Sequence, residues 1–309
     1  MLLVSLLVAA GLVRSRGGPV REGEAILAEV RQKGLAAYWQ PYAVRWYLIQ
    51  AGGQVVGWRA TVTIDRGGTA FEGIHVYVRD SARSDPGHWE WWRLNADATG
   101  GEYRAGKVVR SLLAWQIPTD TTIRLTGGQV FAKQVIQQWV LESQARTAAN
   151  YLPEGTLELA ARLVAERKTR AQFRLIFNED LPLERTTRFR SIRLEYADPA
   201  GSKVPGAQGR VNLEILAGGE QPERAYFFDS GGGLVREIDG LLLSVLVDQE
   251  QVRTRFPDAS GLVISVMQKM DFLFTPETGP SPLPFTSPQT SPGSPPAEPE
   301  SSDQDDPML

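Results

Sequence analysis

The two histidines are the side chains of this sequence best suited to acid–base or metal chemistry. His75 and His88 lie 13 residues apart, and the chain contains no cysteine. A structural zinc site takes four Cys or His ligands as a rule, so these two residues cannot form one alone. Either histidine could act as a general base for a serine, but the sequence has no G-x-S-x-G nucleophile elbow. We therefore expect no metal and no cofactor, and we expect His75 to be a hydrogen-bonded residue of a sheet that shares a strand face with Tyr77.

A second stretch has the spacing of a phosphate-binding loop. Residues 101–108, GEYRAGKV, match G-x4-G-K, but Val108 stands where a Ser or Thr would bind magnesium. The flanking sequence also predicts a hairpin rather than a strand followed by a helix. The acidic pair Glu179-Asp180 precedes Pro182 and is typical of a solvated turn, whereas a glycosidase needs two opposed carboxylates. These features favour a protein that is not an enzyme.

The tryptophans are concentrated in one part of the chain. All eight lie within residues 39–139, and residues 88–93, HWEWWR, contain three of them. Side chains alternate between the two faces of a strand, so Trp89 and Trp91 share one face and Trp92 lies on the other. Core packing is the ordinary role of such large rings, with Trp92 as the expected exposed exception. The alternative is an aromatic groove for an apolar or amphipathic ligand, which would be lined by Trp58, Tyr77, Trp89, Trp91 and Trp92.

Arginines gather in the later part of the chain, in the stretch ERTTRFRSIRLEY. Arg188 and Arg190 fall on one strand face and could contact lipid phosphates or an acidic partner. The alternative interpretation is a solvated outer face that discourages aggregation at the sheet edge.

The last 35 residues have a different composition from the rest. Residues 275–309 contain ten of the 20 prolines, six acidic residues and no Lys or Arg. Such a segment buries too little apolar surface to offset its ordering entropy, so we expect a disordered acidic Pro/Ser tail that could dock a partner. The whole chain has a net charge of −3, which becomes +3 without the tail. Neither value indicates a nucleic-acid-binding protein.

The N-terminus is an apolar run that ends in arginines. Residues 1–16, MLLVSLLVAAGLVRSR, are too short to span a bilayer as a helix, for which about 20 residues are needed. The length and the small residues Val8-Ala9-Ala10 fit a secretory signal, although Arg14 and Arg16 follow the run and no basic residue precedes it. We expect an exported protein, periplasmic or extracellular. The alternative is an N-terminal apolar strand or helix.

Glycine pairs divide the middle of the chain into short runs rich in β-branched and aromatic residues. These pairs begin at Gly52, Gly67, Gly100, Gly127, Gly218 and Gly231. Because glycine adopts the positive φ of tight hairpin turns, the pattern predicts consecutive antiparallel strands. We expect a mainly β domain over residues 21–274, either a large curved antiparallel sheet or a half-barrel with a few short helices. Helices are predicted at 21–34, at 155–168 between two β blocks, and at 248–256, where an Asp248–Gln251 capping box begins the helix and Pro257 ends it.

Three stretches resemble uncharacterised exported β-rich proteins of bacteria. They are the hairpin WYLIQAGGQVVGWRATV, the helix YLPEGTLELAARLVAE and the hairpin YFFDSGGGLVREIDG. The order of elements over residues 20–257 resembles the half-barrel envelope proteins of the lipoprotein-carrier type. This resemblance implies a periplasmic module whose concave aromatic face binds an acyl chain or a partner segment.

Together these observations favour a non-enzymatic binding module of the cell envelope for an apolar or amphipathic ligand or a partner segment. Two alternatives stay open. One is a structural or assembly protein whose acidic tail docks a partner, and the other is a hydrolase that uses His75 or His88.

Overall fold

A computed structural model describes residues 2–39, 43–78, 88–110, 116–176, 189–199, 204–216 and 224–269. The chain divides into a compact unit, Met1–Leu273, and a second unit, Phe274–Leu309. The predicted tail, residues 275–309, lies outside the described residues.

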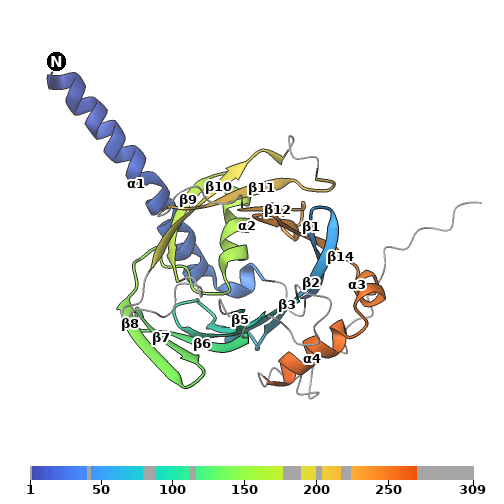
Figure 1. Ribbon diagram of the computed structural model, residues 1–309. Coiled ribbons are helices and arrows are strands. Elements are labelled where there is room, and N and C mark those ends of the chain that lie inside the picture. Colours follow the sequence, from blue (N-terminus) through green and yellow to red (C-terminus); the bar gives the residue numbers. More distant parts are fainter. Residues whose placement is uncertain are drawn as a thin grey trace, which may run out of the picture. The chain divides into compact units, whose positions relative to one another are not determined.

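One antiparallel sheet contains all the named strands, in the order β8-β7-β6-β5-β4-β3-β2-β1-β14-β13-β12-β11-β10-β9. Its first half comprises β1 Ala43–Ala51, β2 Gln54–Asp65, β3 Ala70–Val78, β4 His88–Asn95, β5 Gly101–Arg110, β6 Gln116–Thr126, β7 Gln129–Ile136 and β8 Trp139–Arg146. Its second half comprises β9 Arg170–Leu175, β10 Arg190–Ala197, β11 Gly209–Ile215, β12 Arg224–Phe228, β13 Leu234–Asp239 and β14 Leu242–Val247. The sheet is curved and not closed, since β8 and β9 are its two edges (Figure 1). The predicted fold class is therefore confirmed for the described residues.

Almost every strand pairs with its neighbour in sequence, as the glycine pairs predict. Gly52 and Gly53 join β1 to β2 with φ values of 56° and 81°, and Gly127 and Gly128 join β6 to β7 with 57° and 72°. Two successive positive φ values define the hairpin turn that matches the twist of the strands. The exception is the pairing of β1 with β14, in which Tyr47 lies opposite Leu246. It joins the two predicted β blocks into a single sheet.

Four α-helices and one 3-10 helix are described: α1 Leu2–Lys33, η1 Leu35–Ala37, α2 Leu157–Arg167, α3 Gln249–Arg255 and α4 Ala259–Lys269. The predicted stop of the first helix is confirmed, because the Gly34 N–H donates to Val30 O at 2.8 Å and Gly34 has a φ of 79°. The Asp248–Gln251 capping box is also confirmed. None of the described helices is both long and apolar enough to cross a membrane.

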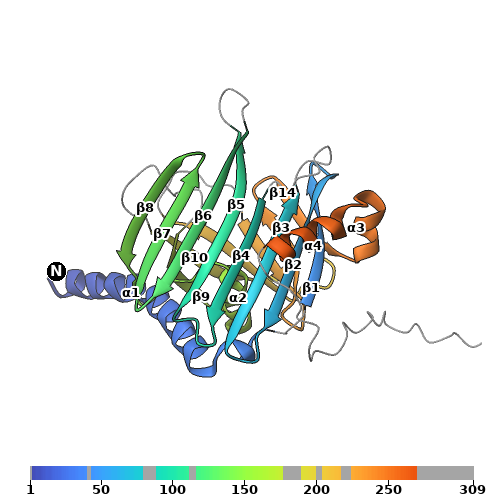
Figure 2. The ribbon, with the colours of Figure 1, turned by 90° about the horizontal axis from the view of Figure 1, so that it is seen from below.

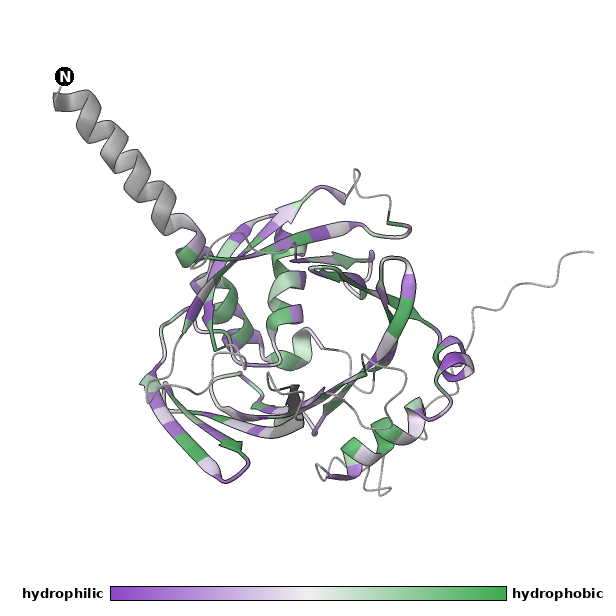
Figure 3. Cartoon of the chain, in the orientation of Figure 1, coloured by the Kyte–Doolittle hydropathy of each residue, from purple (hydrophilic) through white to green (hydrophobic). Residues whose placement is uncertain are grey.

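Helices cover both faces of the sheet. Helix α2 packs against β10, β11 and β12 on the concave face, whereas α3 contacts β1 and α4 contacts β3 on the convex face (Figures 1 and 2). Each face has its own apolar cluster. The inner core surrounds α2 and includes Phe71 and Phe173, and the outer core lies under α3 and α4 and includes Ile74. Figure 3 shows apolar residues on α2 and on the strands around it.

Candidate functional site

The three tryptophans of HWEWWR lie on opposite faces of the sheet, in the alternation that the sequence predicts. Trp92 belongs to the inner core, while Trp89 and Trp91 belong to the outer core. The common aromatic groove that their proximity in sequence allows is therefore not formed by these three rings. Any role in binding must be considered separately for each face.

Trp58, Trp89 and Trp91 pack beneath the C-terminal helices. They are 1%, 9% and 7% exposed, in the same cluster as Val263 and Val266 of α4. All three side chains are therefore buried in the outer core.

Trp92 is only 1% exposed, so the expectation that it would be the exposed ring is wrong. The reason is that the concave face is also covered. Trp39, just after η1, stacks on Trp92 with ring centroids 4.7 Å apart. Gly155 also lies against the Trp92 indole, where a Cβ atom would come within 2.3 Å of the ring.

A cavity of about 440 Å³ opens beside these stacked indoles. It lies between η1, the N-terminal end of α2 and the turn from β12 to β13. Its lining residues are Ala36, Ala37, Tyr38, Trp39, Arg45, Thr61, Thr63, His75, Trp92, Gly155, Glu158, Leu159, Arg162, Asp229, Gly231, Gly232 and Gly233. Of the predicted ligand-binding residues, Trp92 alone lines this cavity.

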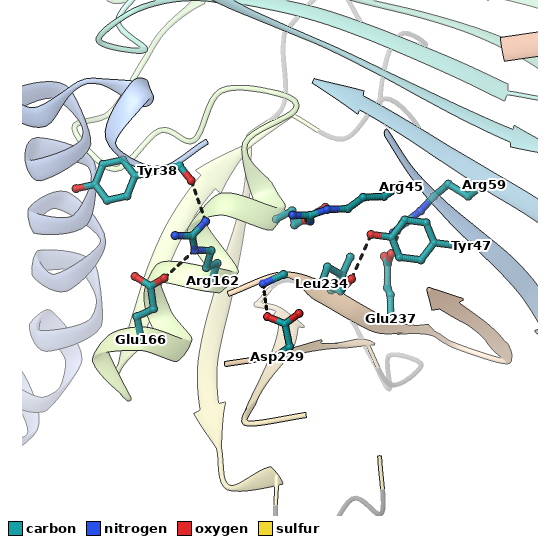
Figure 4. A network of polar contacts seen from close by, with 11 residues as sticks. Tyr38, Arg45, Tyr47, Arg59, Arg162, Glu166, Asp229, Leu234 and Glu237 are labelled. Carbon is teal, nitrogen blue, oxygen red and sulfur yellow. Dashed lines mark hydrogen bonds and ion pairs between the residues drawn. The ribbon is translucent and has the colours of Figure 1, made fainter. Parts of the chain in front are cut away.

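The cationic groups at the cavity are held by acidic and carbonyl partners. Arg45 Nη1 donates to Glu158 Oε1 at 3.1 Å. Arg162 Nε donates to Glu166 Oε1 at 2.7 Å, and its Nη1 donates to the backbone oxygen of Tyr38 at 2.8 Å (Figure 4). These contacts fix two guanidinium groups at the cavity wall, where they can offer their remaining N–H donors to a ligand.

The turn from β12 to β13 forms the opposite part of the wall. Asp229 Oδ1 accepts hydrogen bonds of 2.8 Å from the backbone N–H groups of both Gly231 and Gly233. Gly232 has a φ of 75°, and a Cβ atom there would come within 2.6 Å of Arg162 Nε. The DSGGG stretch is therefore a hairpin turn whose glycines leave room for the arginine.

A buried polar cluster lies on the same concave face around Arg59, which is 5% exposed. Arg59 forms an ion pair with Glu237, and its guanidinium lies 4.2 Å from the ring centroid of Tyr47 (Figure 4). Burial raises the pKa of Tyr47 to about 12, so this phenol stays neutral and donates to Leu234 O at 3.3 Å. Arg59 Nε and Nη2 have no hydrogen-bond partner among the described residues.

Glu90 joins the two histidines on this face. Its Oε1 lies 2.7 Å from His88 Nε2, and its Oε2 lies 3.4 Å from His75 Nδ1. Burial favours the neutral acid, but the hydrogen bonds from both histidines outweigh it and hold the pKa of Glu90 below its usual value. Tyr77 completes the group, with its hydroxyl 3.5 Å from His75 Nδ1. The expectation that His75 is a hydrogen-bonded sheet residue is confirmed.

Of the two predicted cationic residues, only Arg190 falls within the described part of the chain, and Arg188 lies outside it. Arg190 is two residues before Ile192, an inner-core residue, so it shares the concave face. It is half-buried at the start of β10 rather than on a solvated outer face.

No three His, Asp or Glu side chains of the described ranges are placed to hold a metal ion. The sequence interpretation missed Arg59, Glu90 and Glu237. For Arg59 and Glu90 the signal is a charged residue flanked by apolar or aromatic residues in a strand, as at Arg59 between Trp58 and Ala60. Glu237 has no such signal, because its strand LVREID holds two other charged residues.

Comparisons with known proteins assign no family to the chain. No protein-family model matches it, and no curated protein matches it either. Among solved structures, the chain is similar to a β-barrel-like protein of the domain of unknown function DUF1849 from Brucella abortus. The identity is 12%, the match covers 68% of this chain and 98% of that one, and the TM-score is 0.39. That protein is itself named for a domain of unknown function, so the similarity assigns no activity here.

Proposed function

We propose that this protein is a non-enzymatic binding module that takes a small amphipathic ligand into the cavity on the concave face of its sheet. The observation that supports the proposal most directly is the cavity itself. Its volume of about 440 Å³ is in the range of small-molecule sites. It combines an aromatic wall with fixed polar groups.

The two kinds of wall favour an amphipathic ligand over a purely apolar one. Trp39, which is half-buried and stacks on the buried Trp92, offers an aromatic surface to an apolar group. Arg45 and Arg162 stand at the polar part of the lining, so the polar end of a ligand can replace water there. The apolar N-terminal segment supports an exported protein, and we place this binding role in the cell envelope.

The test is native mass spectrometry of the full chain, followed by solvent extraction of any bound species. Ala37 is exposed and lines the cavity, so Ala37→Trp should fill the mouth without disturbing the core. Ala25→Trp, at an exposed position of α1 that does not line the cavity, is the matched control. We expect a co-purifying amphiphile with the wild type and with Ala25→Trp, and none with Ala37→Trp. An empty wild-type protein, or equal occupancy of all three, would refute the proposal.

A hydrolase is a second candidate, which the contact of Glu90 with His75 favours. A carboxylate on Nδ1 leaves Nε2 of the imidazole as the acceptor that a general base requires, and His75 lines the cavity. Against this, the hydroxyls of Thr61 and Thr63 also line the cavity, and neither hydrogen-bonds to His75. We therefore propose that His75 contacts the ligand and does not act as a general base. Turnover of an ester probe that is lost in His75→Gln but kept in His88→Gln would favour the hydrolase instead.

A further inference from the structure

A row of polar side chains crosses the wall of the cavity on the concave face. Arg45 on β1 lies opposite Thr61 on β2, and Thr61 lies opposite His75 on β3. Residues that lie opposite each other on antiparallel strands point to the same face, with Cβ atoms about 5 Å apart. All three residues line the cavity. The row therefore brings a guanidinium, a hydroxyl and an imidazole together on one wall.

The neighbouring row supplies an aromatic surface. Thr63 on β2 lies opposite Gly73 on β3, and Gly73 lies opposite Trp92 on β4. A Cβ atom at Gly73 would clash with the Trp92 ring, so the absence of a side chain there lets the indole lie across β3. Trp39 stacks on that indole from the side of the cavity lining. The polar row and the aromatic pair are thus adjacent in a single cavity.

Arg45 keeps hydrogen-bond donors that the protein does not use. The side chain reaches from β1 toward α2, where its Nη1 donates to Glu158 Oε1 at 3.1 Å (Figure 4). No other described residue forms an ion pair or a hydrogen bond with this guanidinium. Its Nε and Nη2 lie on one edge of the guanidinium plane, where their N–H groups match the two oxygens of a carboxylate or a phosphate. This pair of donors is the free edge of Arg45.

Thr61 is a second polar group without a partner. It is only 7% exposed, and its hydroxyl forms no hydrogen bond with any described residue. A polar group that is buried so deeply ordinarily has a hydrogen-bond partner. Since Thr61 lies directly opposite Arg45, its O–H adds a third donor beside the free edge of Arg45.

The charges around these donors favour a carboxylate over other head groups. The two carboxylates of the lining already accept hydrogen bonds, Glu158 from Arg45 and Asp229 from two backbone N–H groups of its turn. A cationic head group would bring a like charge beside Arg45 and Arg162. A phosphate has three oxygens and up to two negative charges, which is more than three donors beside Glu158 can satisfy. A carboxylate has one charge and two oxygens.

We propose that the polar end of the ligand is a carboxylate, which binds the free edge of Arg45 through both oxygens and accepts a hydrogen bond from the Thr61 hydroxyl. The apolar chain of the ligand lies against Trp39. The ligand is thus a monocarboxylate with an apolar chain. This inference rests on the proposed function, because it names the head group of the ligand that the same cavity takes.

The test is isothermal titration calorimetry of the full chain, freed of co-purified amphiphiles on a hydrophobic resin. Four probes share one ten-carbon chain and differ in the head group: decanoate, decyl phosphate, decanol and decyltrimethylammonium. Each is titrated below its micelle concentration. We expect decanoate to bind at least about tenfold more tightly than each of the other three, because charge-assisted two-oxygen contacts with arginine are strong and specific in geometry.

Two variants test the head-group contacts. Arg45→Lys keeps the charge but loses the free edge, and Thr61→Val removes the hydroxyl at nearly constant volume. Each should weaken decanoate binding by about tenfold and leave decanol binding unchanged. The matched controls are Arg124→Lys, at a 64% exposed side chain, and Thr122→Val. Both lie on β6 and outside the lining of the cavity, so they should bind decanoate as the wild type does.

Equal binding of decanoate and decanol would overturn the inference and leave the proposed function standing. Tighter binding of the phosphate or of the cation would do the same, and so would wild-type affinity for decanoate in both Arg45→Lys and Thr61→Val. If none of the four probes binds, the proposed function fails together with the inference. Circular dichroism of each variant separates loss of a head-group contact from loss of the fold.

Discussion

Replacement of Glu154 by glutamine should stabilise the protein at neutral pH and leave it unchanged in acid. Burial raises the pKa of Glu154 from an ordinary 4.5 to about 7, although the Tyr151 O–H, which lies 2.7 and 2.9 Å from the two carboxyl oxygens and donates to them, acts in the opposite direction. The folded chain therefore binds a proton between pH 4.5 and 7 that the unfolded chain releases. The contribution of Glu154 to folding stability therefore falls as the pH rises through that window and is constant above it.

The size of the effect follows from the shift. At about 1.4 kcal/mol for each pH unit, the ionised Glu154 costs at most about 3 kcal/mol above pH 7. The glutamine side chain of the variant keeps an oxygen that accepts from Tyr151 and has no charge to bury. Urea unfolding of the wild type and of Glu154→Gln should be measured at pH 4.5, 6 and 8. The two free energies of unfolding should be nearly equal at pH 4.5, and that of the variant should be increasingly the higher at pH 6 and 8. Glu250→Gln, at an exposed position of α3, is the control. A difference that is constant with pH, or that favours the wild type at pH 8, would refute this account of Glu154.

Two further predictions concern the concave face. Arg59→Ala leaves the Glu237 carboxylate without its ion-pair partner and should cost about 3–5 kcal/mol of unfolding free energy, most of which the double variant Arg59→Met/Glu237→Met should recover. If thermal unfolding shows that Arg59→Ala and the double variant lose the same unfolding free energy, this account of the ion pair is wrong. Gly155→Ala adds a Cβ atom within 2.3 Å of Trp92 at a φ of 84°, whereas Gly206→Ala adds one in open space at 75°. Urea unfolding should show a loss of about 1 kcal/mol for Gly206→Ala from the backbone alone, and clearly more for Gly155→Ala from the clash. Equal losses would rule out the close contact with Trp92.

Local chemistry in the sequence predicts much of this fold. The turn at Gly52-Gly53 needs two positive φ values that glycine adopts readily, and the structure has both. The predicted helix at 155–168 is observed as α2 Leu157–Arg167, with apolar residues on the face toward the sheet. In both cases the decisive interactions lie within a few residues of each other, so a single sequence contains them.

Other features depend on distant contacts. Helix α4, Ala259–Lys269, has the sequence ASGLVISVMQK, whose β-branched residues favour a strand. It is a helix that covers the outer core, with Val263 and Val266 buried against the convex face. The pairing of β1 with β14 likewise joins segments that nothing local relates. Tertiary packing decides these elements.

The candidate site illustrates the same division. Strand alternation correctly separates Trp92 from Trp89 and Trp91, but it does not say which face is covered, and in this sheet both are. When both faces of a sheet are buried, an aromatic residue is expected on either face and does not indicate a binding site. A charged residue is more informative about polar contacts, because burial of a charge without a partner costs several kcal/mol. Arg59 and Glu90 are such residues. Each has found partners on the concave face, in Glu237 and in the two histidines. In a sheet of this kind, charged residues inside aromatic strands are better guides to a polar interior than the tryptophans around them.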